Sequence, residues 1–220
     1  DFVVCVIFWR IFNPYQRGYF VGTIRPYGQG NTSFLLSSIL NNWSITGTLE
    51  AYSESTDLAL VGIKSSTTAG SSVQASTTSG RSRLYSTTPY NKAIYSFIFR
   101  SSDAASVANA RFFVGLYAGN IVPIGNVNPS TLVNCIGFGA DTGDTNIQLI
   151  HNDATGTATK FDLGVNFPAN TQNVDTYTCA FFIDRHNSKM YAQIERINTG
   201  HVSDILEVTT NLFKINSNLD

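Results

Sequence analysis

The chain has 220 residues, and its 14 Lys and Arg against 15 Asp and Glu give a formal net charge of −1. Charged residues make up 13% of the chain, about half of the roughly 25% in an ordinary soluble domain. Its near-neutral balance lacks the basic patch with which proteins bind nucleic acid, and no run of residues approaches the roughly 18 apolar positions that span a bilayer. We therefore expect neither nucleic acid as a partner nor a membrane span. Polar surface is supplied instead by 22 Ser, 23 Thr and 20 Asn.

The first 40 residues include a run, Phe2–Phe12, that is apolar at every position except Arg10. A strand with apolar residues on both faces is not an ordinary exposed arm. Because open sheet edges recruit extra strands, we expect residues 1–40 to contain an anchoring strand that inserts beside the sheet edge of a partner.

Alternation of apolar and polar residues is the main signal along the rest of the chain. Successive side chains of a strand point to opposite faces, so each alternating run buries one face and exposes the other to water. Such one-sided burial favours antiparallel pairing. The alternating runs are residues 43–52, 95–100, 111–117, 176–183 and 190–195.

Clusters of Gly, Pro, Asn and Asp separate these runs, which is typical of a β-sandwich or jelly roll. We predict one all-β domain over residues 1–220, an antiparallel sandwich with few or no helices. The only helical candidate, Ser102–Ala110, is short enough to be a loop. Residues 65–82 are rich in Ser, Thr and Gly and are predicted to form a loop or a polar edge hairpin, with a hinge between two parts as the alternative.

Cysteine and histidine give no catalytic or metal-binding pattern. Cys5, Cys135 and Cys179 each lie in an apolar run, which predicts buried thiols, although one disulfide among them stays open for an extracellular protein. His151 and His186 stand beside turn-forming residues and are predicted to be surface turn histidines. No catalytic residue is predicted.

The densest polar cluster is the segment from residue 141 to residue 146. Asp141, Asp144 and Asn146 offer oxygen ligands around Gly143, which is what Ca²⁺ coordination requires, although the loop lacks the length and the closing Glu of an EF-hand. The alternative is a tight turn in which the Asp and Asn side chains accept hydrogen bonds from nearby backbone amides. No other cofactor is expected.

Aromatic residues make up 12% of the chain and suit two kinds of contact. Their rings combine an apolar face with a polar edge, as sugar recognition requires, and Trp43 is a candidate, with core packing as the alternative. Surfaces with few charges and many aromatic residues also suit contacts between subunits.

Six stretches within residues 111–200 stand out by their order and spacing: Arg111–Leu116, Asn128–Gly139, Asp141–Asn146, His151–Lys160, Asp162–Gly164 and Arg196–Gly200. Over these stretches the chain resembles a family of tailed-phage virion proteins, of the fibre and decoration type. The resemblance implies a jelly-roll or concanavalin-like β-sandwich and a role in assembly or attachment, without catalytic residues.

We therefore expect a structural or attachment protein on the surface of a phage particle. Its expected partners are other virion subunits, copies of itself in a homo-oligomer such as a trimer, and host glycans. Two alternatives stay open: an architectural capsid or cementing jelly roll, and a virion enzyme that cleaves glycans.

Overall fold

The computed structural model describes nine stretches of the chain, which together hold thirteen strands. Two pairs of short strands form two-stranded antiparallel sheets: β1 (Trp43–Thr46) pairs with β4 (Gln74–Thr77), and β2 (Thr48–Tyr52) pairs with β3 (Leu60–Lys64). The described stretches are residues 43–46, 48–52, 60–64, 74–77, 92–100, 111–117, 127–169, 175–184 and 187–213.

The five-stranded sheet brings together distant parts of the chain. Its order is β12-β11-β10-β5, with β13 pairing β11 as well, and all its pairs are antiparallel. Residues of β5 pair with residues of β10 that lie 76 to 92 positions further along the chain. Its strands are β5 (Lys92–Arg100), β10 (Thr176–Asp184), β11 (Lys189–Arg196), β12 (His201–Val202) and β13 (Leu206–Val208).

The four-stranded sheet is formed by the chain between β5 and β10. Its strands follow one another in space as in sequence, β6-β7-β8-β9, and each pair is antiparallel. One turn of 3₁₀ helix, Pro129–Thr131, precedes β7, and the described residues contain no α-helix. The strands are β6 (Phe112–Tyr117), β7 (Cys135–Ala140), β8 (Gln148–Asn152) and β9 (Thr159–Asp162).

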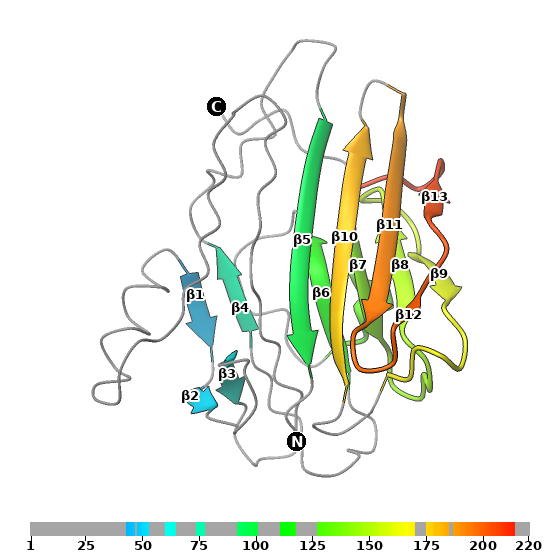
Figure 1. Cartoon of the computed structure of the whole chain (residues 1–220). Coiled ribbons are helices and arrows are strands. Elements are labelled where there is room, and N and C mark those ends of the chain that lie inside the picture. Colours follow the sequence, from blue (N-terminus) through cyan, green and yellow to red (C-terminus); the bar gives the residue numbers. More distant parts are fainter. Residues whose placement is uncertain are drawn as a thin grey trace, which may run out of the picture.

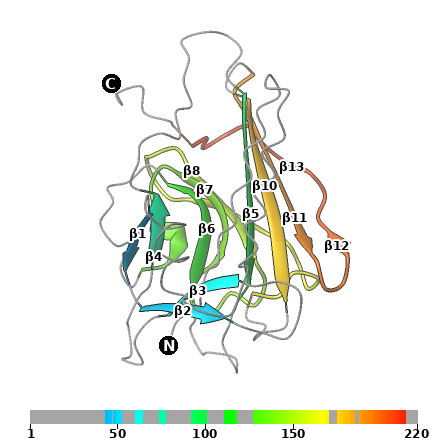
Figure 2. The same ribbon diagram turned by 60° about the vertical axis from the view of Figure 1, so that its left-hand side comes forward.

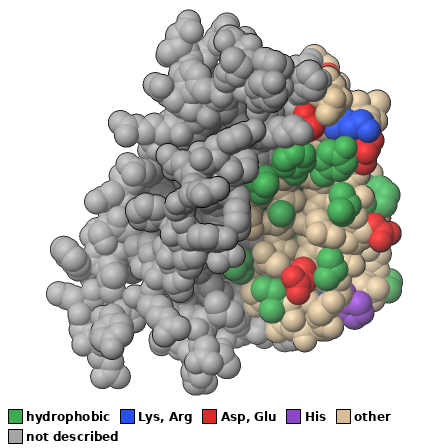
Figure 3. Space-filling model, turned by 45° about the horizontal axis from the view of Figure 1, so that its top comes forward, with side chains coloured by type: hydrophobic (Ala, Val, Ile, Leu, Met, Phe, Trp, Pro, Cys, Tyr) green, Lys and Arg blue, Asp and Glu red, His purple; other side chains and the backbone are tan. Residues whose placement is uncertain are grey.

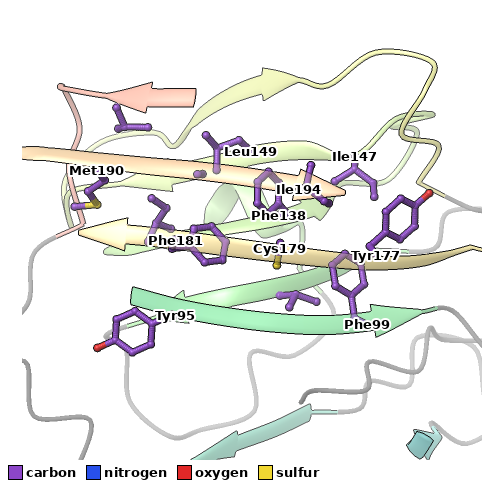
Figure 4. Packing of buried hydrophobic residues seen from close by; sticks show 14 of the residues in the cluster. Tyr95, Phe99, Phe138, Ile147, Leu149, Tyr177, Cys179, Phe181, Met190 and Ile194 are labelled. Atoms are coloured by element: carbon purple, nitrogen blue, oxygen red, sulfur yellow. The ribbon is translucent and has the colours of Figure 1, made fainter. Parts of the chain in front are cut away.

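The two larger sheets lie one behind the other, with β5, β10 and β11 in one layer and β6, β7 and β8 in the next (Figures 1 and 2). Apolar side chains from both layers form one buried cluster between them (Figure 4). Phe138 of β7 packs on Phe181 of β10 with ring centroids 5.3 Å apart. Burial of this apolar surface is the main force that holds the layers together.

The four-stranded sheet is buried on its other face as well. There Leu132, Cys135 and Ile150 form a second buried cluster, against which Phe113 and Tyr117 pack. Glycine makes this packing possible, since a Cβ at Gly137 would lie only 2.5 Å from the ring of Phe113. All six residues of β7 are therefore buried, although the strand is antiparallel to both its neighbours.

The predicted all-β class with antiparallel sheets is confirmed, whereas the sandwich or jelly-roll architecture stays a prediction. The alternating residues of β10 and β11 face the core as the sequence pattern indicates. Every second residue on these two strands is buried: Tyr177, Cys179, Phe181, Ile183, Met190, Ala192 and Ile194.

The strand pairing changes one expectation and adds detail to another. The run 43–52 is not one strand, because β1 and β2 pair with different partners on either side of Gly47. Within 65–82, residues 74–77 form β4 and pair with β1, so this segment is not entirely loop. The predicted anchor at 1–40, the helical candidate at 102–110 and the remainder of 65–82 lie outside the described residues.

Candidate functional site

The loop that joins β7 to β8 brings two of the predicted calcium ligands together around a lysine. Lys160, on β9, places its Nζ 2.9 Å from Oδ2 of Asp141 and 2.6 Å from Oδ2 of Asp144. The side chain of Asp141 is 9% exposed, and that of Lys160 is 29% exposed. A tethered ammonium group thus lies where both carboxylates converge.

The same two carboxylates also accept hydrogen bonds from the backbone. Oδ1 of Asp141 accepts from the amide of Ser130 at 2.9 Å, and Oδ2 of Asp144 accepts from the amide of Asp141 at 2.8 Å. Oδ1 of Asn128 accepts from the amide of Thr142 at 3.1 Å. These contacts are those of the tight turn that the sequence offered as the alternative to a calcium loop.

The charges of the cluster stabilise one another. Burial alone would raise the pKa of Asp141, but the hydrogen bonds from Ser130 and Lys160 outweigh it, so that this pKa lies below its ordinary value. For Lys160, burial acts to lower the pKa, but the hydrogen bonds to Asp144 and Asp141 outweigh it and the pKa is raised. The shifts show that the folded state favours the charged form of Asp141 and Lys160.

Asn146, the third predicted ligand, points to a different partner. Its Nδ2 donates to Oδ1 of Asp162 at 3.0 Å, and Asp162 also accepts from the amide of Gly164 at 2.7 Å. Among the described residues, no group of three or more His, Cys, Asp or Glu side chains could hold a metal ion. Calcium binding at this loop stays a prediction. In the structure, the ammonium group of Lys160 lies beside the carboxylates of Asp141 and Asp144.

A second polar cluster surrounds Asn211, which follows β13. Its Nδ2 donates to the carbonyls of His151 and Thr157, at 3.2 Å each, and its Oδ1 accepts from the amide of Asp153 at 2.9 Å. Its own carbonyl lies 3.1 Å from Nδ1 of His151. The segment after β13 is thereby fixed to the connection between β8 and β9.

This cluster corrects the expectation for His151. The residue is 5% exposed and lies within β8, so it is not a surface turn histidine. Its turn-forming neighbours suggested exposure, but β8 extends to Asn152, and Nδ1 of the His151 ring contacts the carbonyl of Asn211. His186 lies outside the described residues. The prediction of buried thiols is confirmed for Cys135 and Cys179, and burial raises the pKa of Cys135 to about 12.

The beginning of β10 is joined to the end of β11 by a buried ion pair. Nε and Nη2 of Arg196 lie 2.7 and 2.9 Å from the two carboxylate oxygens of Asp175, which is 1% exposed. The amide of Thr176 donates to Oδ1 of Asn198 at 2.6 Å. This bidentate pair orders the turn that follows β11.

The outer face of the five-stranded sheet carries half-buried side chains on β5, β10 and β11. In Figure 2 no described strand covers the outer side of β5, β10 and β11, and Figure 3 shows hydrophobic side chains gathered on the described surface with few charged ones between them. Pairing across the strands places the outer residues in three half-buried rows. These rows are Ile94–Phe182–Tyr191, Ser96–Ala180–Gln193 and Ile98–Thr178–Glu195.

Comparison with known proteins gives no relative: no protein-family model, curated protein or solved structure matches the chain. The resemblance to tailed-phage virion proteins therefore stays a prediction. No helix within the described stretches has the length and apolarity needed to cross a membrane.

Sequence reasoning found the carboxylates of the loop but missed the lysine that pairs with them. Lys160 follows Asp141 by 19 positions and Asp144 by 16, a spacing typical of no motif. The only available signal was that Lys160 is the single Lys or Arg between residue 141 and residue 162. Asn211 offered no signal at all, because it lies 60 residues from His151.

Proposed function

We propose that the chain is a structural subunit of a virion appendage or decoration, and that it works by protein–protein contact. The observation that carries this proposal is the composition of the outer face of β5 and β10. On the same face Asp184, at the end of β10, is charged and buried, whereas the six described side chains between the strand ends carry no charge and include one aromatic ring. They are Ile94, Ser96, Ile98, Thr178, Ala180 and Phe182.

The core of a protein interface is depleted in charged residues and enriched in aromatic ones, which matches this face. Charges lie instead toward the edge of the sheet, on β11 and β13, where Lys189 forms an ion pair with Glu207 at 2.7 Å. A neutral centre with a charged margin is the usual anatomy of a contact surface.

The polar clusters support the same proposal. Lys160 is held by two carboxylates and Arg196 by Asp175, so these charged groups hold turns in place. The resemblance over residues 111–200 adds the expectation of a phage particle. Together they favour a structural role over the alternative of a glycan-cleaving enzyme.

Immunogold electron microscopy tests the proposal. An antibody raised against the chain is expected to label phage particles, on the head or on the tail, and labelling should vanish when the antibody is first absorbed with the chain. Unlabelled particles beside a labelled soluble fraction would overturn the proposal. Release of reducing sugar from host polysaccharide by the purified chain would favour the enzyme instead.

A further inference from the structure

We propose that two copies of the chain pair along the open edge of β9, antiparallel and about a two-fold axis through Phe161, so that their four-stranded sheets join into one continuous sheet. The inference goes beyond the proposed function, because it identifies one contact and one partner, a second copy of the chain. It follows from the exposure of β9 and from the direction of its backbone hydrogen bonds.

β9 is the last strand of the four-stranded sheet and is exposed along its whole length. It pairs with β8 on one side, and no described strand pairs with it on the other, as Figure 1 also shows. All its residues are exposed, and Phe161 is 52% exposed. Lys160 is exposed as a residue although its side chain is only 29% exposed, so its backbone faces water. The edge is therefore accessible to another strand.

The backbone groups of two residues point outward from this edge. In an antiparallel pair, alternate residues direct both N–H and C=O toward the partner strand. The amide of Leu163 donates to the carbonyl of Ile147 at 3.1 Å, on the β8 side, so every second residue back from Leu163, beginning with Phe161, also faces β8. The N–H and C=O groups of Lys160 and Asp162 therefore point away from β8, where a further strand would meet them.

The two charged side chains of β9 do not protect this edge. The ammonium group of Lys160 reaches back across β8 to the carboxylates of Asp141 and Asp144, in the loop that follows β7. Oδ1 of Asp162 accepts a hydrogen bond from Asn146, which precedes β8, at 3.0 Å. Charged side chains at an edge strand hinder pairing when they are free to extend past it. Here both are held over their own sheet.

β9 is also fixed in place at both ends. After the strand, the carbonyl of Asn166 accepts from Nη1 of Arg196 at 3.3 Å, which holds that loop against the five-stranded sheet. Before the strand, the carbonyl of Thr157 accepts from Nδ2 of Asn211 at 3.2 Å. An edge that is already extended and fixed pairs with a second strand at little cost in ordering.

A two-fold axis through Phe161 is the symmetric register that fits this edge best. Because the outward groups lie on Lys160 and Asp162, the registers with the longest overlap have their axis at one of these residues or at Phe161. The axis at Phe161 pairs Lys160 with Asp162 of the other copy through about four backbone hydrogen bonds, and brings the two exposed rings together. Either other axis sets a charged residue opposite its own copy, which destabilises a strand pair. It also shortens the overlap, since Phe161 is midway between Thr159 and Leu163.

The contact is small, and we expect it to be weak in solution. Strand addition at an edge gains its affinity from main-chain hydrogen bonds rather than from buried area. A single pair of strands buries less than a standard interface, so the dissociation constant should be roughly 10–100 µM. On a particle that carries many copies, a high local concentration would keep such a contact closed.

Disulfide crosslinking of the full chain tests the axis. Residues that meet at a non-hydrogen-bonded position of an antiparallel pair have Cα atoms about 4.5 Å apart, which a disulfide can span. At about 100 µM and under mild oxidation, Phe161→Cys should form a linked dimer at least about tenfold faster than Val165→Cys, although Val165 is 84% exposed. Mass spectrometry of the linked peptide shows whether the introduced thiols are joined. Equal rates at the two positions would overturn the proposed axis.

Opposite charges at the axis provide a second test, by sedimentation velocity over a concentration series. Phe161→Lys and Phe161→Asp should each raise the dissociation constant at least about tenfold, because each alone places like charges at the axis. Their equimolar mixture should recover the dimer, and the control Val165→Lys should leave it intact. Circular dichroism should show all three variants folded, because Phe161 and Val165 are exposed. A mixture that does not recover the dimer would contradict the pairing.

Two further outcomes would overturn the pairing. One is an unaltered chain that stays monomeric up to about 1 mM, well above the expected dissociation constant. The other is a dimer that no Phe161 variant weakens, which would show that a different surface forms it. If particles carry the immunogold label in either case, the proposed function stands without this contact, and unlabelled particles would overturn the function by itself.

Discussion

The four-stranded sheet is buried at every residue of β7 and β8, whereas β11 of the five-stranded sheet alternates between buried and half-buried positions. Both sheets are antiparallel, so strand direction does not cause the difference. Within the described part of the chain, apolar clusters lie on both faces of the four-stranded sheet, whereas the cluster on the five-stranded sheet lies on its inner face. β7 and β8 of the first sheet therefore contribute both faces to the core, whereas β11 of the second contributes one.

Glycine accounts for the close packing of the four-stranded sheet. Gly115 on β6 stands opposite Gly137 on β7, and a Cβ at Gly115 would collide with the backbone carbonyl of Ile136. The five-stranded sheet has no glycine in its described strands. A single added methyl group should therefore distinguish the two sheets.

The largest effect is expected from Gly115→Ala. Backbone atoms must shift to admit the new methyl group, and we expect a loss of about 3 kcal/mol in the free energy of unfolding, measured by chemical denaturation. Ser96→Thr adds one methyl group to the open face of β5 and should change stability by less than about 0.5 kcal/mol. Equal effects at the two positions would contradict the contrast between the sheets.

An intermediate loss of stability is expected from Lys160→Met, on β9 at the edge of the four-stranded sheet. The variant leaves the carboxylates of Asp141 and Asp144 without their ammonium partner, and we expect a loss of about 2 kcal/mol at pH 7, between the values for exposed and for buried ion pairs. Thermal melting of both proteins over a pH series measures this loss.

The sign of the pH dependence follows from the two shifted pKa values. Because the pKa of Asp141 is lowered in the folded state, its contribution is present above its ordinary value of about 3.9 and disappears as the pH falls further. Because the pKa of Lys160 is raised, its contribution is complete below about 10.4 and disappears as the pH rises beyond its folded value. The difference between the two proteins should be largest between these limits, and a constant difference would contradict the ion-pair account.

Calcium provides a second measurement on the same loop. With the ammonium of Lys160 between Asp141 and Asp144, the unaltered chain should give no heat of Ca²⁺ binding and no shift in melting temperature. A clear stabilisation by Ca²⁺ that Asp144→Ala removes would restore the calcium site and contradict the structural role of the lysine.

The smallest effect is expected from Asn211→Gly, at the link between the two sheets. Asn211 has a positive φ of 49°, which Gly adopts without strain, so the change removes the side-chain hydrogen bonds alone. We expect a loss of about 1 kcal/mol in the free energy of unfolding, with faster hydrogen exchange of the Asp153 amide. Unchanged exchange at that amide would show that the link contributes nothing.

The local pattern of apolar and polar residues was sufficient to predict burial where neighbours in the sequence determine it. The alternation along β10 and β11 identified their buried faces, and apolar surroundings identified Cys135 and Cys179 as buried. The same pattern failed where pairing or burial depends on a residue far away in the sequence. Lys160 lies up to 19 residues from its partners, and Asn211 lies up to 60 residues from its own. The buried His151 contacts Asn211.

The order of the strands also has a consequence for folding kinetics. The four-stranded sheet is a meander, and its β7–β8 and β8–β9 hairpins close over short loops, at a small cost in chain entropy. Pairing of β5 with β10 closes a loop that contains this entire sheet. We therefore expect the meander to form first and to act as the template on which β5 and β10 meet. This non-local step should set a slow folding rate.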